Sequence, residues 1–415
     1  MSRLDELISE LCPSGVELVP LEEVILSLNT GLNPRQFFRL NTVDAKNYYV
    51  TIRELRNNKV IFTDKTDRIN DEALKLCNNR SNLEVGDVLF SGTGTIGETA
   101  VIESPPINWN IKEGVYAIKP DKKRIISRFL MYVLMSQRVR ERYLVKALGG
   151  TVKSVSMGEM KKLLIPIPPL PVQQEIVRIL DNFTELTAEL TAELTAELTA
   201  RRKQYEYYRD LLLTFGDEVP RVAIDDLFNI RNGYTPSKSN KEYWENGVIP
   251  WFRMEDIREN GRILSNALQY VSINAVKGRP FPANSIIIST SATIGEHALI
   301  QTEFLANQRF TILSLKNEYQ DVNIKYLFYY CYILGEWCKN NLTLGHFASV
   351  DMVAFKKFRI PLPPLKEQER IVAILDRFDA LCNDLTSGIP AEIEARQKQY
   401  EYYRDKLLSF KEVTA

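Results

Sequence analysis

The long connector in the middle of the chain, from Ile165 to Asp210, reads IPIPPLPVQQEIVRILDNFTELTAELTAELTAELTARRKQYEYYRD. It opens with a proline-rich segment, and prolines do not continue a helix but do stiffen its approach. From Val172 to Phe215 there is neither Gly nor Pro. The sequence therefore predicts one unbroken helix of about 44 residues, roughly 66 Å long at about 1.5 Å per residue.

Inside this helix, three identical TAEL units begin at Thr187, Thr191 and Thr195. Four residues turn a helix by about 400°, so each unit adds roughly 6 Å and 40°. We expect the repeat to act as a spacer, although a plain solvated helix of good helix formers is the alternative. The spacer positions that we single out are Thr187, Leu190, Leu194 and Leu198. Apolar residues at steps of three and four predict a helix-pair seam through Ile176, Leu180, Phe183, Leu186, Leu190, Leu194 and Leu198.

The connector is duplicated. QQEIVRILDNF at 173–183 matches QERIVAILDRF at 368–378, and KQYEYYRD at 203–210 recurs unchanged at 398–405, an offset of 195 residues in both cases. The second connector contains Ser387-Gly388-Ile389-Pro390, which predicts two helices with a break between them. Because both seams lie in one chain, we expect the connectors to pair as an intramolecular antiparallel coiled coil.

The blocks before the connectors match more faintly. GTGTIGETAVI at 92–102 pairs with TSATIGEHALI at 290–300, and LGGTVKSV at 148–155 pairs with LGHFASV at 344–350. Both blocks mix short β-rich runs with one helical stretch near their end, at 127–145 and 323–340. We therefore predict an α+β fold with a pseudo-two-fold internal repeat. Its parts are a first block with a short N-terminal helix (1–165), a central helix (166–215), a second block (216–360) and a distal helical region (361–415).

Composition narrows the class of protein. The 415 residues include 53 basic and 53 acidic ones, and this zero net charge argues mildly against a nucleic-acid binder. No apolar run is long enough to span a membrane, so we expect no membrane partner. Five Cys without CxxC spacing predict neither a disulfide framework nor a zinc site. A cytoplasmic protein with buried thiols is the expected class.

Catalytic motifs are missing from the sequence. Residues 92–97 read GTGTIG and fit GxGxxG, but a strand-like run follows instead of a helix, so a turn is predicted. The chain has two His, His297 and His346, and the first block has none. A duplicated enzyme would be expected to keep its acid/base residue in both halves. We predict no catalytic residues, no cofactor and no metal.

Polar and basic residues recur in corresponding loops of the two blocks. We pair Arg53 with Arg253, and Asn110 and Lys112 with Asn307 and Arg309. Arg, Asn and Lys read base edges, and Ser and Thr contact phosphates. The predicted DNA contacts are Arg53, Thr93, Thr95, Asn110, Lys112, Lys153, Ser154, Arg253, Thr290, Ser291, Thr293, Asn307, Arg309, His346 and Ser349. The residues predicted for a partner or helix-pair interface are Tyr205, Tyr208, Tyr400 and Tyr403.

With the order block, helix, block, helix, the PIPPLPVQQEIVRILD and PLPPLKEQERIVAILD connectors and the repeated KQYEYYRD, the whole chain resembles the DNA-specificity subunit of Type I restriction–modification enzymes. The resemblance implies that each block is a target recognition domain for one half of a bipartite double-stranded DNA site. It also implies that the helices set the spacer and dock two methyltransferase subunits, with motor and nuclease subunits in the larger assembly. Catalysis would then lie in those other subunits.

Two alternatives stay open on the residues alone. One is a fused DNA methyltransferase or nuclease with a degenerate site, for which saturable methyl-donor binding by the isolated chain would argue. The other is a coiled-coil adaptor that does not bind DNA, against which salt-dependent retention on duplex DNA would argue.

Overall fold

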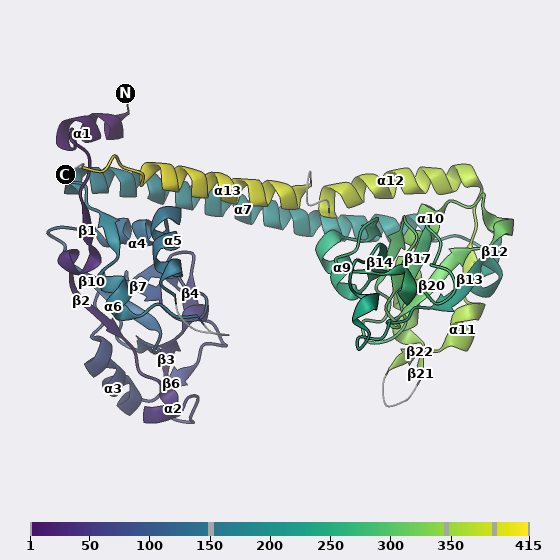
Figure 1. Ribbon diagram of the computed structural model, residues 1–415, viewed down its shortest axis with the longest axis horizontal. Helices are drawn as coiled ribbons and strands as arrows, with labels where there is room; N and C mark the ends of the chain where they lie inside the picture. The colour runs from purple at the N-terminus through teal and green to yellow at the C-terminus, as the bar shows by residue number, and fades with distance from the viewer. Residues whose placement is uncertain (1, 148–152, 344–347, 384–387, 414–415) are drawn as a thin grey trace. The chain divides into compact units, whose positions relative to one another are not determined.

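The computed structural model describes residues 2–147, 153–343, 348–383 and 388–413 (Figure 1). The chain forms two compact units, Met1–Ala192 with Glu394–Ala415, and Glu193–Ile393. The main sheets of the two units have equivalent strands in equivalent order, which confirms the predicted internal repeat of an α+β fold.

The first unit has the following elements. Its strands are β1 (Leu18–Pro20), β2 (Ile25–Thr30), β3 (Asn47–Val50), β4 (Leu55–Arg56), β5 (Lys59–Val60), β6 (Arg68–Ile69), β7 (Val88–Ser91), β8 (Thr99–Val101), β9 (Trp109–Ile111), β10 (Val115–Pro120) and β11 (Leu164–Pro166). Its helices are α1 (Arg3–Leu11), η1 (Leu21–Val24), α2 (Pro34–Phe37), η2 (Ile52–Glu54), α3 (Asp71–Ser81), α4 (Ser127–Met135), α5 (Gln137–Val145), α6 (Met157–Lys161), the first part of α7 (Leu170–Leu212) and most of α13 (Ile389–Leu407).

The second unit repeats this plan. Its strands are β12 (Arg221–Ala223), β13 (Phe228–Asn232), β14 (Ile249–Phe252), β15 (Ile263–Leu264), β16 (Tyr270–Val271), β17 (Ser285–Ser289), β18 (His297–Ile300), β19 (Leu305–Ala306), β20 (Phe310–Leu315), β21 (Leu342–Thr343), β22 (Ser349–Val350) and β23 (Arg359–Pro361). Its helices are the last part of α7, α8 (Ile224–Leu227), η3 (Lys241–Tyr243), α9 (Met254–Asn260), η4 (Ile273–Ala275), η5 (Asn317–Tyr319), α10 (Ile324–Asn340), α11 (Met352–Lys357) and α12 (Leu365–Asn383).

In the described residues each unit has one larger sheet, one smaller three-stranded sheet and two two-stranded sheets. The larger sheet has the order β2-β10-β7-β8 in the first unit and β13-β20-β17-β18 in the second, where β15 adds a parallel edge. The smaller sheets, β6-β3-β9 and β16-β14-β19, each join one antiparallel and one parallel pair. The matching order shows that the duplication extends through both blocks, beyond the connectors where the sequence signal is strongest.

The central strands of the larger sheets are buried on both faces. In β17, Ile286 and Ile288 pack into one core and Ile287 into the other, all 0% exposed. In β7, Val88 and Leu89 divide between two cores in the same way. Alternate side chains of a strand point to opposite faces, so a continuous apolar run requires cover on both sides.

The helical stretch predicted at 127–145 is two helices, α4 and α5. Ser136 separates them with an extended backbone (φ −62°, ψ 142°), and its hydroxyl donates to the Val133 carbonyl over 2.7 Å. A serine that bonds its own backbone offers an alternative to the helical ladder. The corresponding stretch of the second unit is the single helix α10.

Each connector is anchored to its own block by the same contacts. The Gln173 side chain accepts from the Ile126 amide at 2.9 Å, and Gln368 accepts from the Asn323 amide at 2.9 Å. Both side-chain amides also donate, over 2.8 Å, to a carbonyl of the proline-rich lead-in. The repeated PLP and PLK lead-ins therefore fix where each long helix begins.

A second pair of contacts strengthens this anchor. The Tyr132 hydroxyl donates to Asp181 at 2.8 Å, and the Tyr329 hydroxyl donates to Asp376 at 2.7 Å. Burial raises the pKa of both phenols, so each remains a donor at neutral pH.

The helical connectors form as predicted, with one correction to the seam. α7 is continuous, whereas the second connector divides into α12 and α13, which begins at Ile389 just before Pro390. Within the first unit α13 lies antiparallel to α7, and within the second unit α12 does so. Leu186 is 60% exposed, so the seam does not include it, whereas Phe183, 38% exposed, borders the seam and stacks on Tyr403 of α13. No helix in the described part of the chain is long and apolar enough to cross a membrane.

Candidate nucleic-acid interface

In the first unit, the turn between β7 and β8 lies against the segment that precedes α6. Thr93 and Ser154 form an isolated antiparallel bridge, and the Gly94 amide donates to the Lys153 carbonyl over 3.0 Å. The side chains of Thr93, Thr95 and Lys153 are exposed, and Ser154 is half-buried. Four residues predicted from two distant motifs therefore share one polar surface.

The second unit places the equivalent residues in the same way. Ser291 and Ser349 form the corresponding bridge. Thr290, Ser291, Thr293 and Ser349 are all half-buried, so this surface is less open than its counterpart. His346, also predicted to contact DNA, lies outside the described residues.

The turn in each unit depends on a glycine with positive φ, 103° at Gly97 and 89° at Gly295. A Cβ at Gly295 would lie 2.6 Å from the carbonyl oxygen of Gly335 in α10, so the turn and the helix pack backbone to backbone. A strand follows each turn, as predicted, and not the helix that a dinucleotide site requires.

The smaller sheets show which loop positions correspond, and the predicted pairing changes. The Lys112 amide donates to the Val50 carbonyl at 2.8 Å, and the Asn307 amide donates to the Phe252 carbonyl at 3.0 Å. Lys112 is therefore the counterpart of Asn307, and the predicted pairing of Asn110 with Asn307 is wrong by two positions.

The same shift applies to the arginines. Thr51 and Arg253 each follow the small-sheet strand, and each backbone amide donates to a carboxylate three residues on, Glu54 at 2.8 Å and Asp256 at 2.7 Å. Arg253 is thus the counterpart of Thr51 and not of Arg53. Both arginines follow similar β-rich runs, which suggested that they correspond. Loop lengths differ between the blocks, so the number of residues that separates counterparts changes along the chain.

Two predicted DNA contacts are engaged inside the first unit. Asn110 is 0% exposed; its side chain accepts from Ser81 and donates to Asn78, both over 2.7 Å. Arg53 donates to Asp67 over 2.6 Å and to the Thr51 hydroxyl over 3.2 Å. Asn110 cannot reach DNA without unfolding its surroundings, because a buried amide needs these partners.

A cavity of about 640 Å³ in the second unit gathers the predicted residues Arg253, Thr293, Asn307 and Arg309. Its lining also includes residues that the sequence analysis missed: Thr235, Lys238, Lys241, Trp244, Glu245, Trp251, Met254, Glu255, Gln269, Gln308 and Phe310. A signal was present in Trp244 and Trp251, two of the four tryptophans of the chain, near two lysines. Aromatic faces, amides and cations in one hollow are typical of nucleic-acid recognition.

A larger groove of about 1310 Å³ adjoins this cavity within the second unit, and Met254 and Thr293 line both. Cations predominate slightly in the groove, with Arg202, Arg209, Arg258, Arg262, Lys325 and Lys339 against Glu206, Glu259, Glu296, Asp376 and Asp379. Burial raises the pKa of the Asp379 carboxyl above its usual range. The arginines that line this groove offer hydrogen-bond donors for phosphates. Because the chain has no net charge, its overall electrostatic attraction for DNA should be modest.

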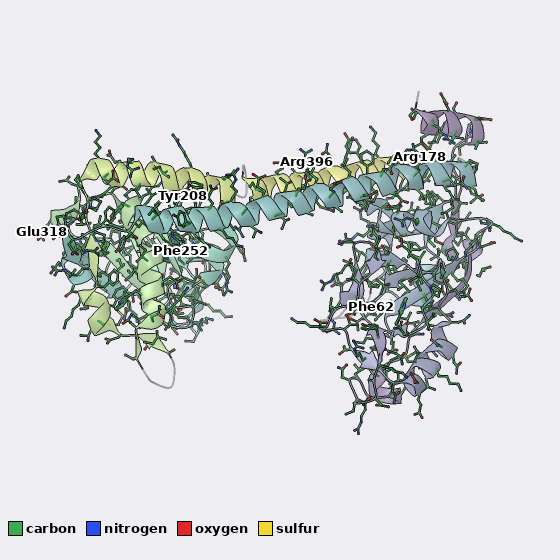
Figure 2. All side chains as sticks on the ribbon, turned by 180° about the vertical axis from the view of Figure 1, so that it is seen from behind. Phe62, Arg178, Tyr208, Phe252, Glu318 and Arg396 are labelled. Carbon is green, nitrogen blue, oxygen red and sulfur yellow. The ribbon has the colours of Figure 1, made fainter. Side chains whose placement is uncertain are left out.

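The connectors carry two matching aromatic surfaces. The first aromatic patch consists of Phe183, Tyr402 and Tyr403, and the second consists of Phe378, Tyr207 and Tyr208. Phe183 stacks on Tyr403 with ring centroids 6.0 Å apart, and Phe378 stacks on Tyr208 at 5.9 Å. Figure 2 shows Tyr208 on α7 in the second unit.

Each connector has one largely exposed tyrosine and one buried tyrosine at equivalent positions. Tyr207 and Tyr402 are 65% and 62% exposed, whereas Tyr205 and Tyr400 are 4% and 9% exposed. The Tyr400 hydroxyl is 2.9 Å from the Thr184 hydroxyl, and the Tyr205 ring packs against that of Phe378. Of the four predicted interface tyrosines, Tyr205 and Tyr400 therefore belong to the helix pair, and Tyr208 and Tyr403 to the aromatic patches.

His297 lies in the core of the second unit. It is 1% exposed, its Nδ1 is 3.1 Å from the Gly295 carbonyl, and its ring packs on Tyr332. Burial and, to a smaller extent, the nearby Arg262 charge together lower the pKa of His297 to about 3. Within the described residues, no group of three or more His, Cys, Asp or Glu is arranged to hold a metal ion.

The chain matches a known family model over most of its length. The Type I restriction modification DNA specificity domain matches twice, at residues 13–200 and 217–395. A solved structure from work on assembly and conformational transition of the type I R-M system aligns with a TM-score of 0.68 at 19% identity, over 95% of this chain and 97% of that one. That similarity concerns the fold.

Curated relatives carry the same description. The chain is 60% identical over 206 residues to the EcoprrI specificity subunit of Escherichia coli, and 42% identical over 275 residues to the EcoR124I/EcoR124II specificity subunit of the same organism. These matches cover 48% and 62% of this chain, and 51% and 65% of those relatives. A specificity subunit of Haemophilus influenzae is 34% identical over 75% of this chain and 80% of its own length. The chain belongs to the Type I restriction–modification DNA specificity family, as the connector motifs predicted, with one family domain matched in each half.

Proposed function

We propose that this chain is a non-catalytic, sequence-specific DNA-recognition subunit that reads a bipartite, asymmetric site in double-stranded DNA. Residues 1–165 and 216–360 act as the two target recognition domains, one for each half-site. The observation that carries the proposal is the duplication itself, because two copies of one framework present different side chains at equivalent positions.

The differences lie at loop positions that the two units hold by the same backbone hydrogen bonds. Thr51 corresponds to Arg253, and Lys112 corresponds to Asn307, on loops whose backbone hydrogen bonds are the same. Thr93 corresponds to Ser291 at the turn bridge that both units contain. Since Arg, Lys and Asn prefer different base edges and phosphates, the two half-sites should differ in sequence.

The connectors, 166–215 and 361–415, act in this proposal as a ruler between the half-sites. The helix α7 has 43 residues, so it is roughly 64 Å long at about 1.5 Å per residue. Leu194 in the TAEL repeat is 9% exposed, and Leu190 and Leu198 are half-buried. Because these leucines and Thr187 are at least partly buried, each TAEL unit has a fixed position in the packed helix. Adding or removing one unit should therefore change the distance between the half-sites.

The two aromatic patches are the docking surfaces that we assign to two methyltransferase subunits. Tyr and Phe dominate the energetics of protein interfaces, and the same three side chains occur in both connectors in the same stacking arrangement. Motor and nuclease subunits join the larger assembly, and the complex acts in the cytoplasm. With no net charge, the chain alone should bind DNA weakly, and its partners should supply further contacts.

The experiment is to express the chain with its modification subunits in cells that lack other methylation and to sequence the methylated sites. We expect one interrupted motif with two dissimilar half-sites. A continuous motif, a palindromic one or no sequence preference would contradict the proposal.

A further inference from the structure

The Arg253 position is rigid before any ligand binds. Its backbone follows β14 and begins α9, where its amide is held by Asp256 at 2.7 Å. Its guanidinium lies over the Trp251 ring, 5.5 Å from the centroid. The Trp251 indole is itself fixed by a 3.1 Å hydrogen bond to the Tyr234 carbonyl. An arginine held on an aromatic face loses less conformational entropy when it forms hydrogen bonds.

The donors of this guanidinium are not used within the described structure. Its Nε is buried and has no hydrogen-bond partner among the described residues. The acid paired with it is Glu255, whose oxygen is 3.9 Å from Nε and therefore beyond hydrogen-bond distance. The side chain is 31% exposed and lines the cavity described above. A ligand in the cavity can reach only the exposed part of this side chain, so the terminal nitrogens of the fork, which donate to no described residue, are the donors available to it.

The rest of the cavity suits a polyanion. Its charged lining comprises Lys238, Lys241, Arg253 and Arg309 against Glu245 and Glu255, four cations against two acids. Asn307 and Arg309 stand on the adjoining loop, where the Asn307 side chain accepts from the Arg309 amide at 2.9 Å. Cations around the rim would bind phosphates, leaving the fixed arginine to meet a base.

We propose that Arg253 is a specificity-determining residue that reads a guanine in the half-site bound by the second unit. The guanidinium fork donates to O6 and N7 of guanine in the major groove, the pairing that arginine makes most often with bases. Lys238, Lys241 and Arg309 contact the flanking phosphates. This inference rests on the proposed function, and it adds the residue and the base.

The first unit cannot read its half-site in this way. The position equivalent to Arg253 is Thr51, whose hydroxyl is bonded to Glu54 over 2.8 Å. The neighbouring Arg53 is engaged by Asp67. The guanine contact is therefore specific to the second half-site, and Arg53 provides a matched control.

The test uses the full chain in complex with its modification subunits, with Arg253→Lys, Arg253→Gln and the control Arg53→Lys. Methylation rates are measured on duplexes in which each base pair of the two half-sites is changed in turn. Arg253→Lys keeps the charge but not the fork, so discrimination for guanine at one position of one half-site should fall on the order of ten- to a hundredfold. Arg253→Gln should shift that position towards adenine. Arg53→Lys should leave the motif unchanged, and thermal unfolding checks that each variant is folded.

The failures are distinguishable. A wild-type complex without an interrupted motif overturns the proposed function itself. An intact wild-type motif that neither Arg253 variant alters overturns only the role of Arg253. Uniform weakening at every sequence, with no change of motif, makes Arg253 a phosphate contact and also overturns the reading of a base.

Discussion

At the scale of single residues, Asn110 and Lys112 show that a polar side chain near a predicted DNA-binding loop need not be able to contact DNA. They are two positions apart, and the sequence pattern treats them alike. Residues two apart in a strand point to the same face, so the pattern alone would give them the same surroundings. Asn110, however, lies within β9, and Lys112 lies beyond its end. As a result, Asn110 is fully buried and Lys112 is exposed.

This contrast predicts opposite phenotypes. Asn110→Ala should lower the free energy of unfolding by about 1–3 kcal/mol, because it leaves Ser81 and Asn78 without their buried partner. Lys112→Ala should change stability by less than about 0.5 kcal/mol, and should lower the salt dependence of DNA binding by about one phosphate contact. Denaturant unfolding and salt-titrated binding of the complex measure the two effects. A stable Asn110→Ala variant with weakened DNA binding would contradict this assignment.

His297 gives a pH dependence with a definite sign. Its folded pKa of about 3 lies below its ordinary value near 6.5, so between these values the unfolded chain binds a proton that the folded chain does not. The contribution that neutral His297 makes to the free energy of unfolding is complete above about pH 6.5. It is lost as the pH falls, by at most about 1.4 kcal/mol per pH unit.

The measurement is denaturant unfolding of the full chain at pH 7 and pH 5. His297→Gln should reduce the loss of stability between these two values. His346→Gln, in the other histidine of the chain, serves as the control. Equal loss in the wild type and in His297→Gln would show that His297 does not carry the effect.

At the scale of elements, the sequence predicted the long helices best. Absence of Gly and Pro is a local signal, and α7 forms as one helix for that reason. The split between α4 and α5 was missed, because it depends on the Ser136 side chain bonding to its own backbone. The exposure of Leu186 does not follow from the sequence either, because a stripe with steps of three and four does not say where the partner helix lies.

The aromatic patches give a prediction about the connectors. Tyr208→Ala should remove one of two methyltransferase subunits, and the double variant with Tyr403→Ala should remove both, each at a cost of about 2 kcal/mol of binding free energy. Native mass spectrometry of the assembled complex counts the subunits. Phe37→Ala, an aromatic residue 53% exposed elsewhere in the first unit, should leave the assembly intact. Full assembly of the double variant would exclude the patches as docking surfaces.

At the scale of the whole molecule, the duplication was predictable and the cavity around Arg253 was not. Repeated connectors are local and near-identical, so the sequence shows them directly. The cavity assembles side chains from the loops near β13, β14 and β20, and only the paired sheets reveal that Arg253 corresponds to Thr51. Because loop lengths differ between the two blocks, no single difference in residue number relates all equivalent positions.

In the proposed function, the length of the connector between the two recognition units sets the distance between the half-sites. The most direct test deletes one TAEL unit, Thr191–Leu194, and maps the methylated motif of the complex. Removing about 6 Å of helix should shorten the gap between half-sites by about one to two base pairs, at roughly 3.4 Å each, with both half-site sequences intact. An unchanged gap, or altered half-site sequences, would rule out the connector as the ruler between the half-sites.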